Sequence, residues 1–249
     1  ASLQGRTVAS SLESHQSGIR SGATSGFSAD SLHTASPAGD EKWASKRGVL
    51  GARLVNNATK ILSALDSKLN RAVELTLFGR AAFALSYTNA PKEFAASRDI
   101  DAILWIGQAE ELAETTNFWE AVEEVNEQFR DQELYISHLF EENQVVLTQQ
   151  WKEQRLPVDG LWRKLMLFRL GDADLFLSKL MRFDPQDLAD ARFAVDQAGW
   201  NEDEVSEIVA SARVPNVPEL REQFALCAAE FLQRNSASRD RVTLNSAAI

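Results

Sequence analysis

The stretches VELTLFGRAAFAL (residues 73–85) and SRDIDAIL (residues 97–104) decide the fold of this chain. The first alternates apolar and polar side chains and then becomes uniformly apolar up to Gly79, which predicts a strand that ends in glycine. The alanine-rich residues that follow favour a helix. The second stretch predicts another strand, over residues 99–106. Strands and helices that alternate at this short spacing indicate a domain built from both.

Two acidic residues, Asp99 and Asp101, begin the second predicted strand. Residues two apart in a strand point to the same face, about 6–7 Å apart, so both carboxylates are expected to face solvent together. Such a pair can bind hard cations such as Mg²⁺. Gly79 would let a phosphate approach the N-terminus of the following helix, where free N–H groups favour anions. The alternative is a solvated strand start, because 36 of the 249 residues are acidic.

The rest of the chain predicts further strands and then only helices. We expect helices over residues 43–70 and 108–129, a hairpin of residues 134–140 and 144–148, and a basic edge strand over residues 163–170. From residue 172 onward the pattern is helical, with Asp184 and Asn201 as typical N-cap residues.

Changes in composition suggest where the domains begin and end. Residues 1–40 are rich in Ser, Gly and Ala and poor in large apolar side chains, so we expect a disordered tail without a signal peptide. We expect an α+β domain over residues 41–170, a helical domain over residues 171–235 and a loose tail over residues 236–249. The predicted fold class is therefore α+β, a small mixed sheet followed by a C-terminal helical bundle.

The composition argues against several classes of protein. The chain has 26 Lys and Arg against 36 Asp and Glu, a formal net charge of −10, which disfavours broad nucleic-acid binding. A single cysteine, Cys227, cannot form an intrachain disulfide, and three histidines disfavour a multi-histidine zinc centre. No apolar stretch reaches the roughly 18 residues of a membrane span, so we expect a cytoplasmic protein without membrane partners.

Three segments together resemble the nucleotidyltransferase superfamily, in particular its polymerase-β-like minimal and AbiEii-like toxin branch. They are LFGRAAFAL (residues 77–85), SRDIDAIL (residues 97–104) and DLFLSKLMRFDPQDLADARFAV (residues 174–195). The resemblance covers residues 73–197. It implies Mg²⁺-dependent transfer of a nucleotidyl group from a nucleoside triphosphate to a macromolecular acceptor, tRNA or protein. In the toxin branch it also implies an antitoxin partner.

The resemblance assigns roles to single residues in a cleft between sheet and helices. Gly79 matches the glycine of the phosphate loop, and Asp99 and Asp101 match the paired metal ligands. Lys179 matches the lysine of the later helix, where its ammonium would neutralise the leaving pyrophosphate. These four residues form the core of the predicted catalytic site.

Arg80, Arg98 and Asp187 complete the predicted nucleotide-binding site. Asp187 and Asp190 match the trailing acids of the family signature, and Asp187 would orient the lysine; the alternative is a set of ordinary surface ion pairs. Arg80 stands where the family has a second small residue, so it either contacts phosphate or blocks the site.

The third family carboxylate is expected on a neighbouring strand, but residues 134–140 contain no acid in their middle. His138 occupies the inward position, as a metal ligand, a proton acceptor or a structural residue. This departure supports a second hypothesis, in which the chain is a catalytically silent scaffold that binds a partner protein.

Overall fold

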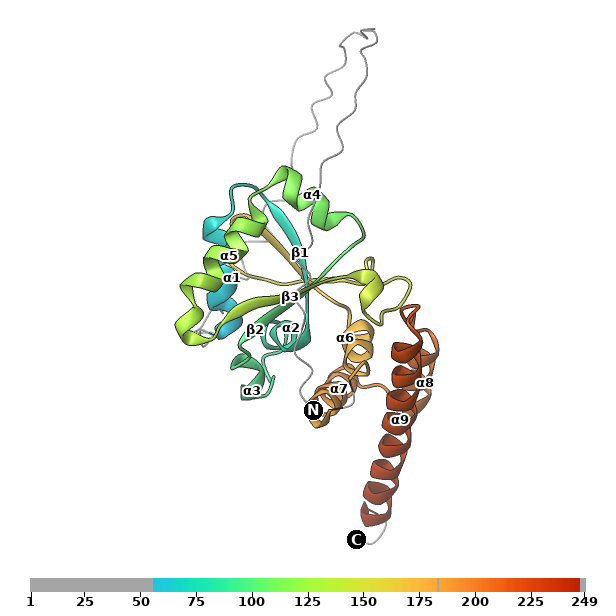
Figure 1. Ribbon diagram of the computed structural model, residues 1–249. Helices are drawn as coiled ribbons and strands as arrows, with labels where there is room; N and C mark the ends of the chain where they lie inside the picture. The colour runs from blue at the N-terminus through green and yellow to red at the C-terminus, as the bar shows by residue number, and fades with distance from the viewer. Residues whose placement is uncertain (1–55, 183, 247–249) are drawn as a thin grey trace, which may run out of the picture. The chain divides into compact units, whose positions relative to one another are not determined.

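The computed structural model describes residues 56–182 and 184–246 (Figure 1). In chain order, its helices and strands are α1 (Asn57–Lys68), β1 (Val73–Phe78), α2 (Gly79–Ser86), α3 (Lys92–Ala95), β2 (Asp99–Leu104), α4 (Gln108–Thr115), α5 (Phe118–Gln128), β3 (Tyr135–Glu141), β4 (Leu156–Pro157), β5 (Leu165–Arg169), α6 (Asp172–Lys179), α7 (Pro185–Ala198), α8 (Glu202–Ala210) and α9 (Pro218–Ser246). Short 3-10 helices span Arg130–Gln132 and Glu142–Gln144. The predicted tail over residues 1–40 lies outside the described residues.

The strands form one mixed sheet in the order β3-β2-β1-β5-β4. β1 runs parallel to β5 and antiparallel to β2, and β2 runs parallel to β3. Apolar side chains such as Leu75, Leu77 and Ile100 are fully buried, and helices α1, α2 and α5 pack against these strands. The predicted α+β class, with a small mixed sheet and C-terminal helices, is confirmed.

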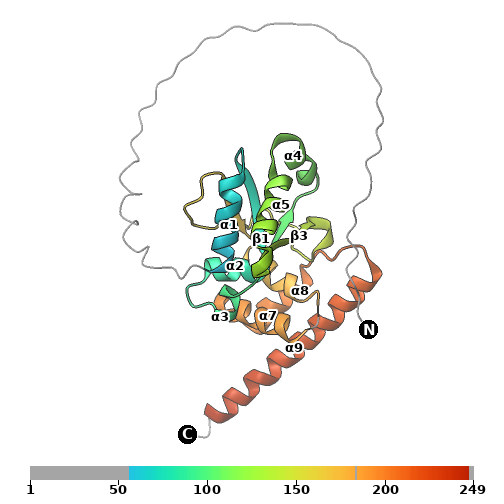
Figure 2. The ribbon, with the colours of Figure 1, turned by 60° about the vertical axis from the view of Figure 1, so that its left-hand side comes forward.

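Helices α6–α9 follow the sheet and group together, apart from α1 and α5 (Figures 1 and 2). The ring of Phe176 in α6 packs against Trp200 and against Phe231 of α9. The predicted caps are confirmed, because the side chains of Asp184 and Asn201 accept hydrogen bonds from the backbone at the starts of α7 and α8. α9 continues past residue 235, where we expected the helical domain to end. In the described ranges, no helix has the length and apolar character that a membrane span needs.

The predicted long helix over residues 108–129 is wrong, because two polar residues divide it into α4 and α5. Thr116 Oγ1 donates to the carbonyl of Leu112 at 2.7 Å. The Asn117 side chain accepts from the backbone N–H of Asn70 and donates to the carbonyl of Lys68. The Thr116 bond lies within its own turn and competes with the helical pattern, whereas Asn117 is held by backbone groups at the end of α1 and just after it. Together they end one helix and begin another.

The predicted return strand over residues 144–148 is also wrong, and the strand predicted over residues 163–170 is confirmed as β5 but not in its edge position. β3 leads into the 3-10 helix at Glu142–Gln144, and no return strand follows over residues 144–148; instead Leu147 pairs with Arg213 in an isolated bridge far along the chain. The basic strand is not at the edge, because β5 lies between β1 and β4, and its Arg169 is buried.

Candidate active site

A β-bulge brings the predicted metal ligands together with a histidine from the neighbouring strand. The pairing of β2 with β3 matches Ile100 with Ile136 and then Asp101 with His138, so Ser137 is passed over. Bulges re-aim side chains and are frequent beside active sites. Here the bulge places the imidazole of His138, rather than the hydroxyl of Ser137, directly beside Asp101.

The three side chains form one cluster. His138 Nδ1 lies 2.8 Å from Asp101 Oδ1, and Ser97 Oγ donates to Asp99 Oδ1 at 2.9 Å. Asp99, Asp101 and His138 each contribute one potential ligand atom, and these atoms all lie within 4.8 Å of one another. Carboxylate oxygens and an imidazole nitrogen at this separation are a donor set that fits a divalent cation.

Gly79 leaves the room that this cluster needs. Its φ of +68° is a left-handed conformation that favours glycine, and a Cβ there would lie 2.6 Å from Asp101 Oδ2. Any larger residue would displace the carboxylate or the backbone. The glycine also begins α2, so backbone N–H groups at the helix start lie next to the acidic cluster. The structure therefore brings together the predicted glycine and both predicted aspartates.

The Asp101 carboxylate is poorly solvated, with its side chain 20% exposed. Burial and, after it, the negative charge of Asp99 raise the pKa of Asp101, while the hydrogen bond from His138 acts in the opposite direction. Two such carboxylates repel each other when both are ionised. A bound cation would remove that repulsion, which is a second reason why the cluster fits a metal ion.

Lys179 is held between two aspartates of α7. Its Nζ lies 3.1 Å from Asp187 Oδ1 and 2.9 Å from Asp190 Oδ2, and all three side chains are buried. These contacts differ from ordinary surface ion pairs, because neither partner can turn to solvent. The buried aspartates fix where the ammonium sits.

Arg80 and Arg98, both predicted to contact nucleotide, point elsewhere. The Arg80 guanidinium donates to Asp190 from Nε and from a terminal nitrogen, at 3.0 and 2.8 Å. The hydrogen bond to Asp190 raises the pKa of Arg80, and its guanidinium also covers the ring of Phe94. Arg98 forms an exposed ion pair with Glu133. A nucleotide contact by either arginine stays a prediction that the geometry does not support.

A cavity of about 130 Å³ joins the acidic cluster to the buried lysine. Its polar and charged lining includes Asp101, His138, Lys179, Arg182 and Asp187, with Gly79 beside them, and its apolar lining is Phe78, Phe140, Val145 and Met181. Pockets that enclose a whole small ligand measure roughly 300–1,000 Å³. This cavity therefore suits the phosphates of a ligand rather than an entire nucleotide.

Arg182 is a cavity residue that the predicted site omitted. Its side chain is 73% exposed, and its Nε donates to Asp187 Oδ2 at 3.0 Å. Burial disfavours the charged form, but the carboxylates around it, Asp187 first, outweigh that effect and raise the pKa of Arg182. Its position three residues after Lys179, just beyond the end of α6, was the signal that could have identified it.

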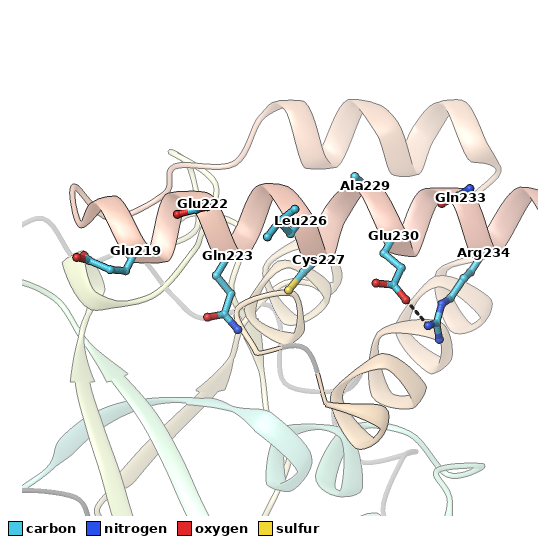
Figure 3. A pocket seen from close by; sticks show the side chains of 9 residues that line it. All are labelled: Glu219, Glu222, Gln223, Leu226, Cys227, Ala229, Glu230, Gln233 and Arg234. Atoms are coloured by element: carbon cyan, nitrogen blue, oxygen red, sulfur yellow. Dashed lines mark hydrogen bonds and ion pairs between the residues drawn. The ribbon is translucent and has the colours of Figure 1, made fainter. Parts of the chain in front are cut away.

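A larger hollow, about 710 Å³, lies along α9 and is lined by side chains of that helix alone (Figure 3). Its one arginine, Arg234, pairs with Glu230 (Figure 3). Exposed Leu226 and several glutamates make up much of the rest. None of the predicted site residues lies there, and acidic side chains do not attract phosphate. The smaller cavity is the better candidate for an active site.

Comparison with known proteins agrees with this geometry. Residues 53–216 match the sequence model of a family described as "Nucleotidyltransferase of unknown function (DUF6036)". A search of curated proteins and a search of solved structures each found no match. The matched residues cover more than half of the chain and include the whole cavity. The predicted nucleotidyltransferase superfamily is thus confirmed, whereas the AbiEii-like branch stays a prediction. The chain belongs to this family of nucleotidyltransferases of unknown function.

Proposed function

We propose that the chain transfers a nucleotidyl group from a nucleoside triphosphate to a hydroxyl group of a macromolecular acceptor, with Mg²⁺ as the expected cofactor. One observation carries this proposal: Asp99, Asp101 and His138 form a donor set for a metal ion, and the cavity that Gly79, Asp101 and His138 line is also lined by Lys179 and Arg182. Acidic metal ligands and cations around one cavity are the arrangement that a metal–triphosphate substrate needs.

The acidic cluster would hold the metal ion through Asp99, Asp101 and His138. When bound, the ion supplies positive charge that polarises the phosphoryl group and stabilises the leaving oxygen. Gly79 contributes by having no side chain, so that a phosphate can approach the backbone N–H groups at the start of α2.

The two cations that line the cavity, Lys179 and Arg182, would bind the triphosphate in two ways. The ammonium of Lys179 has three N–H groups; it donates one to Asp187 and forms an ion pair with Asp190, so it keeps donor capacity for a phosphate oxygen. Arg182 pairs with Asp187 through Nε, which leaves its terminal nitrogens to reach a phosphate at the exposed side of the cavity. We therefore assign a fixed contact to Lys179 and an adjustable one to Arg182.

The acceptor and the biological role are proposed from the resemblance of the three sequence segments. They support tRNA or protein as the acceptor, and a toxin that acts in the cytoplasm and is restrained by an antitoxin. The size of the cavity supports a macromolecular acceptor, because only the reacting groups need to enter it.

One observation favours the alternative of a catalytically silent scaffold. His138 stands where a third carboxylate was expected, so the cluster carries one formal negative charge fewer. A scaffold would retain the fold and its partner contacts but would not transfer nucleotide.

The test is label transfer from each of the four nucleoside triphosphates, labelled at the α-phosphate, to total RNA or to total protein in the presence of Mg²⁺. The proposal predicts labelled acceptor with the wild type and none with Asp101→Asn. Asp131→Asn is the matched control, because it removes an exposed carboxylate outside the cavity. Label that never reaches an acceptor would support the scaffold, and equal labelling by Asp101→Asn would reject the assigned site.

A further inference from the structure

We propose that His138 shifts the metal preference of this site from Mg²⁺ to Mn²⁺. The inference rests on the proposed function, since it concerns the same cluster, but it goes beyond it because Mn²⁺ replaces the expected Mg²⁺ as the preferred ion. The ligand atoms are two carboxylate oxygens and one imidazole nitrogen. Mg²⁺ takes oxygen ligands almost exclusively, whereas first-row transition ions also bind imidazole well. Among these ions Mn²⁺ shares with Mg²⁺ the preference for carboxylate oxygens and octahedral sites, and as a transition ion it also accepts imidazole, so it fits the mixed set better than Mg²⁺ does.

The imidazole is oriented in advance for this role. Its Nδ1 lies 2.8 Å from Asp101 Oδ1 and 2.9 Å from Ser137 Oγ. The ring also stacks on Phe140, with centroids 5.5 Å apart and planes within 3° of each other. Nδ1 is therefore the ring nitrogen that faces the Asp101 carboxylate, and a bound ion would take the place of the hydrogen between these two atoms. The His138 side chain is 51% exposed, so an ion in water can reach it.

The charge of the cluster also favours Mn²⁺ over Mg²⁺. Two carboxylates and a neutral imidazole carry a formal charge of −2, where three carboxylates would carry −3. A hard ion such as Mg²⁺ depends on that charge more than Mn²⁺, which gains from the nitrogen ligand. Substituting His138 with aspartate should therefore improve Mg²⁺ binding and remove the advantage of Mn²⁺.

The experiment measures binding of each ion alone to the full chain, by calorimetry with MnCl₂ or MgCl₂. The electron paramagnetic resonance signal of free Mn²⁺, with Mg²⁺ as competitor, gives a second measure. Neither readout depends on catalytic activity. The variants are His138→Asp and His138→Gln. The control is His15→Gln/His33→Gln, which removes the other two histidines of the chain. Melting temperatures establish that each variant is folded.

We expect the wild type to bind Mn²⁺ at least about tenfold more tightly than Mg²⁺. His138→Asp should reduce this ratio about tenfold or more, and His138→Gln should weaken Mn²⁺ binding about ten- to hundredfold. The double control should keep the wild-type ratio. Binding of both ions with the same ratio in wild type and His138→Asp would overturn the inference and leave the proposed function standing. Binding of neither ion by the wild type would overturn both.

Discussion

Replacing Gly79 with alanine separates backbone strain from damage to the acidic cluster, because the chain offers a matched control. Gly79 and Gly199 have almost the same left-handed φ, +68° and +70°. An L-residue in this conformation costs roughly 1–2 kcal/mol. A Cβ at Gly79 would lie 2.6 Å from Asp101 Oδ2, whereas a Cβ at Gly199 meets no described atom within 4 Å. Both variants should therefore lose similar stability, and only Gly79→Ala should move the Asp101 carboxylate.

Urea unfolding and calorimetric titration with MnCl₂ together measure both effects. We expect each variant to lose about 1–2 kcal/mol of unfolding free energy. Gly79→Ala should bind the metal at least about tenfold more weakly than the wild type, as expected when a ligand is displaced, whereas Gly199→Ala should bind it unchanged. If Gly79→Ala binds the metal as tightly as the wild type, a Cβ at residue 79 does not displace the Asp101 carboxylate, and the explanation is wrong. An equal loss of affinity in Gly199→Ala would also contradict it, since that would trace the effect to general destabilisation.

Three further predictions concern the buried ion pairs and the open arginine. Asp190→Asn should lower the unfolding free energy by about 3–5 kcal/mol, because Arg80 and Lys179 both lose a buried carboxylate partner. The control is Asp196→Asn, an exposed position on the same helix, which should change the unfolding free energy by less than about 0.5 kcal/mol. Small and equal losses of unfolding free energy in the two variants, measured by urea unfolding, would contradict this prediction. Burial would raise the pKa of Asp66, but hydrogen bonds from the backbone N–H groups of residues 163–165 outweigh it and lower that pKa. A lowered folded-state pKa stabilises the fold above the unfolded value of about 4, and this contribution is lost as pH falls through the folded value. The stability deficit of Asp66→Asn should therefore be large at pH 7 and shrink towards pH 3; a deficit that does not change with pH would count against the bond network. Arg182→Ala should weaken triphosphate binding about tenfold while leaving stability unchanged, whereas Lys179→Ala should reduce both, since it leaves buried aspartates without a partner. Wild-type affinity in Arg182→Ala, measured by calorimetry, would remove Arg182 from the site.

The elements that could be predicted from the sequence are those that local chemistry decides. Alternating apolar residues located β1 and β2, and the side chains of Asp184 and Asn201 marked the starts of α7 and α8. The alternation along a strand and the bond from a cap side chain to its own helix are both local features, so the sequence pattern alone contains the information.

The missed elements depend on contacts between distant residues. Apolar spacing continues across Thr116 and Asn117, and the break is fixed by bonds from Asn117 to Asn70 and Lys68, about fifty positions away. The apolar residues around Leu147 are extended but pair with Arg213, so their composition alone resembled a strand of a hairpin. Local patterns cannot distinguish these cases.

The residues of the candidate site also differ in how far the local sequence predicts them. Gly79, Asp99 and Asp101 follow from a strand that ends in glycine and an adjacent strand that begins with two acids. His138 was also expected at the inward position of its strand, and the structure places it beside Asp101. The bulge that passes over Ser137 to bring it there could not be predicted, because it depends on how β3 pairs with β2 and not on the local pattern.

The cations of the site were harder still to assign. Arg80 was placed in the site from its neighbour Gly79, yet the structure pairs it with Asp190 of α7, 110 residues later. A long flexible side chain such as that of Arg80 can reach several carboxylates, and which of them it pairs with depends on how the helices pack.

Transfer of a nucleotidyl group is tested most directly by following two labels through the same reaction. One sample contains a nucleoside triphosphate labelled at the α-phosphate, and its twin contains the same compound labelled at the γ-phosphate. Both are incubated with cell extract, the wild-type chain and Mg²⁺ or Mn²⁺, with Asp101→Asn in parallel. If the chain transfers a nucleotidyl group, the wild type alone attaches the α-label to an acceptor, while the γ-label leaves with pyrophosphate. Attachment of the γ-label, or no attachment of the α-label from any nucleoside triphosphate with either ion, would contradict it.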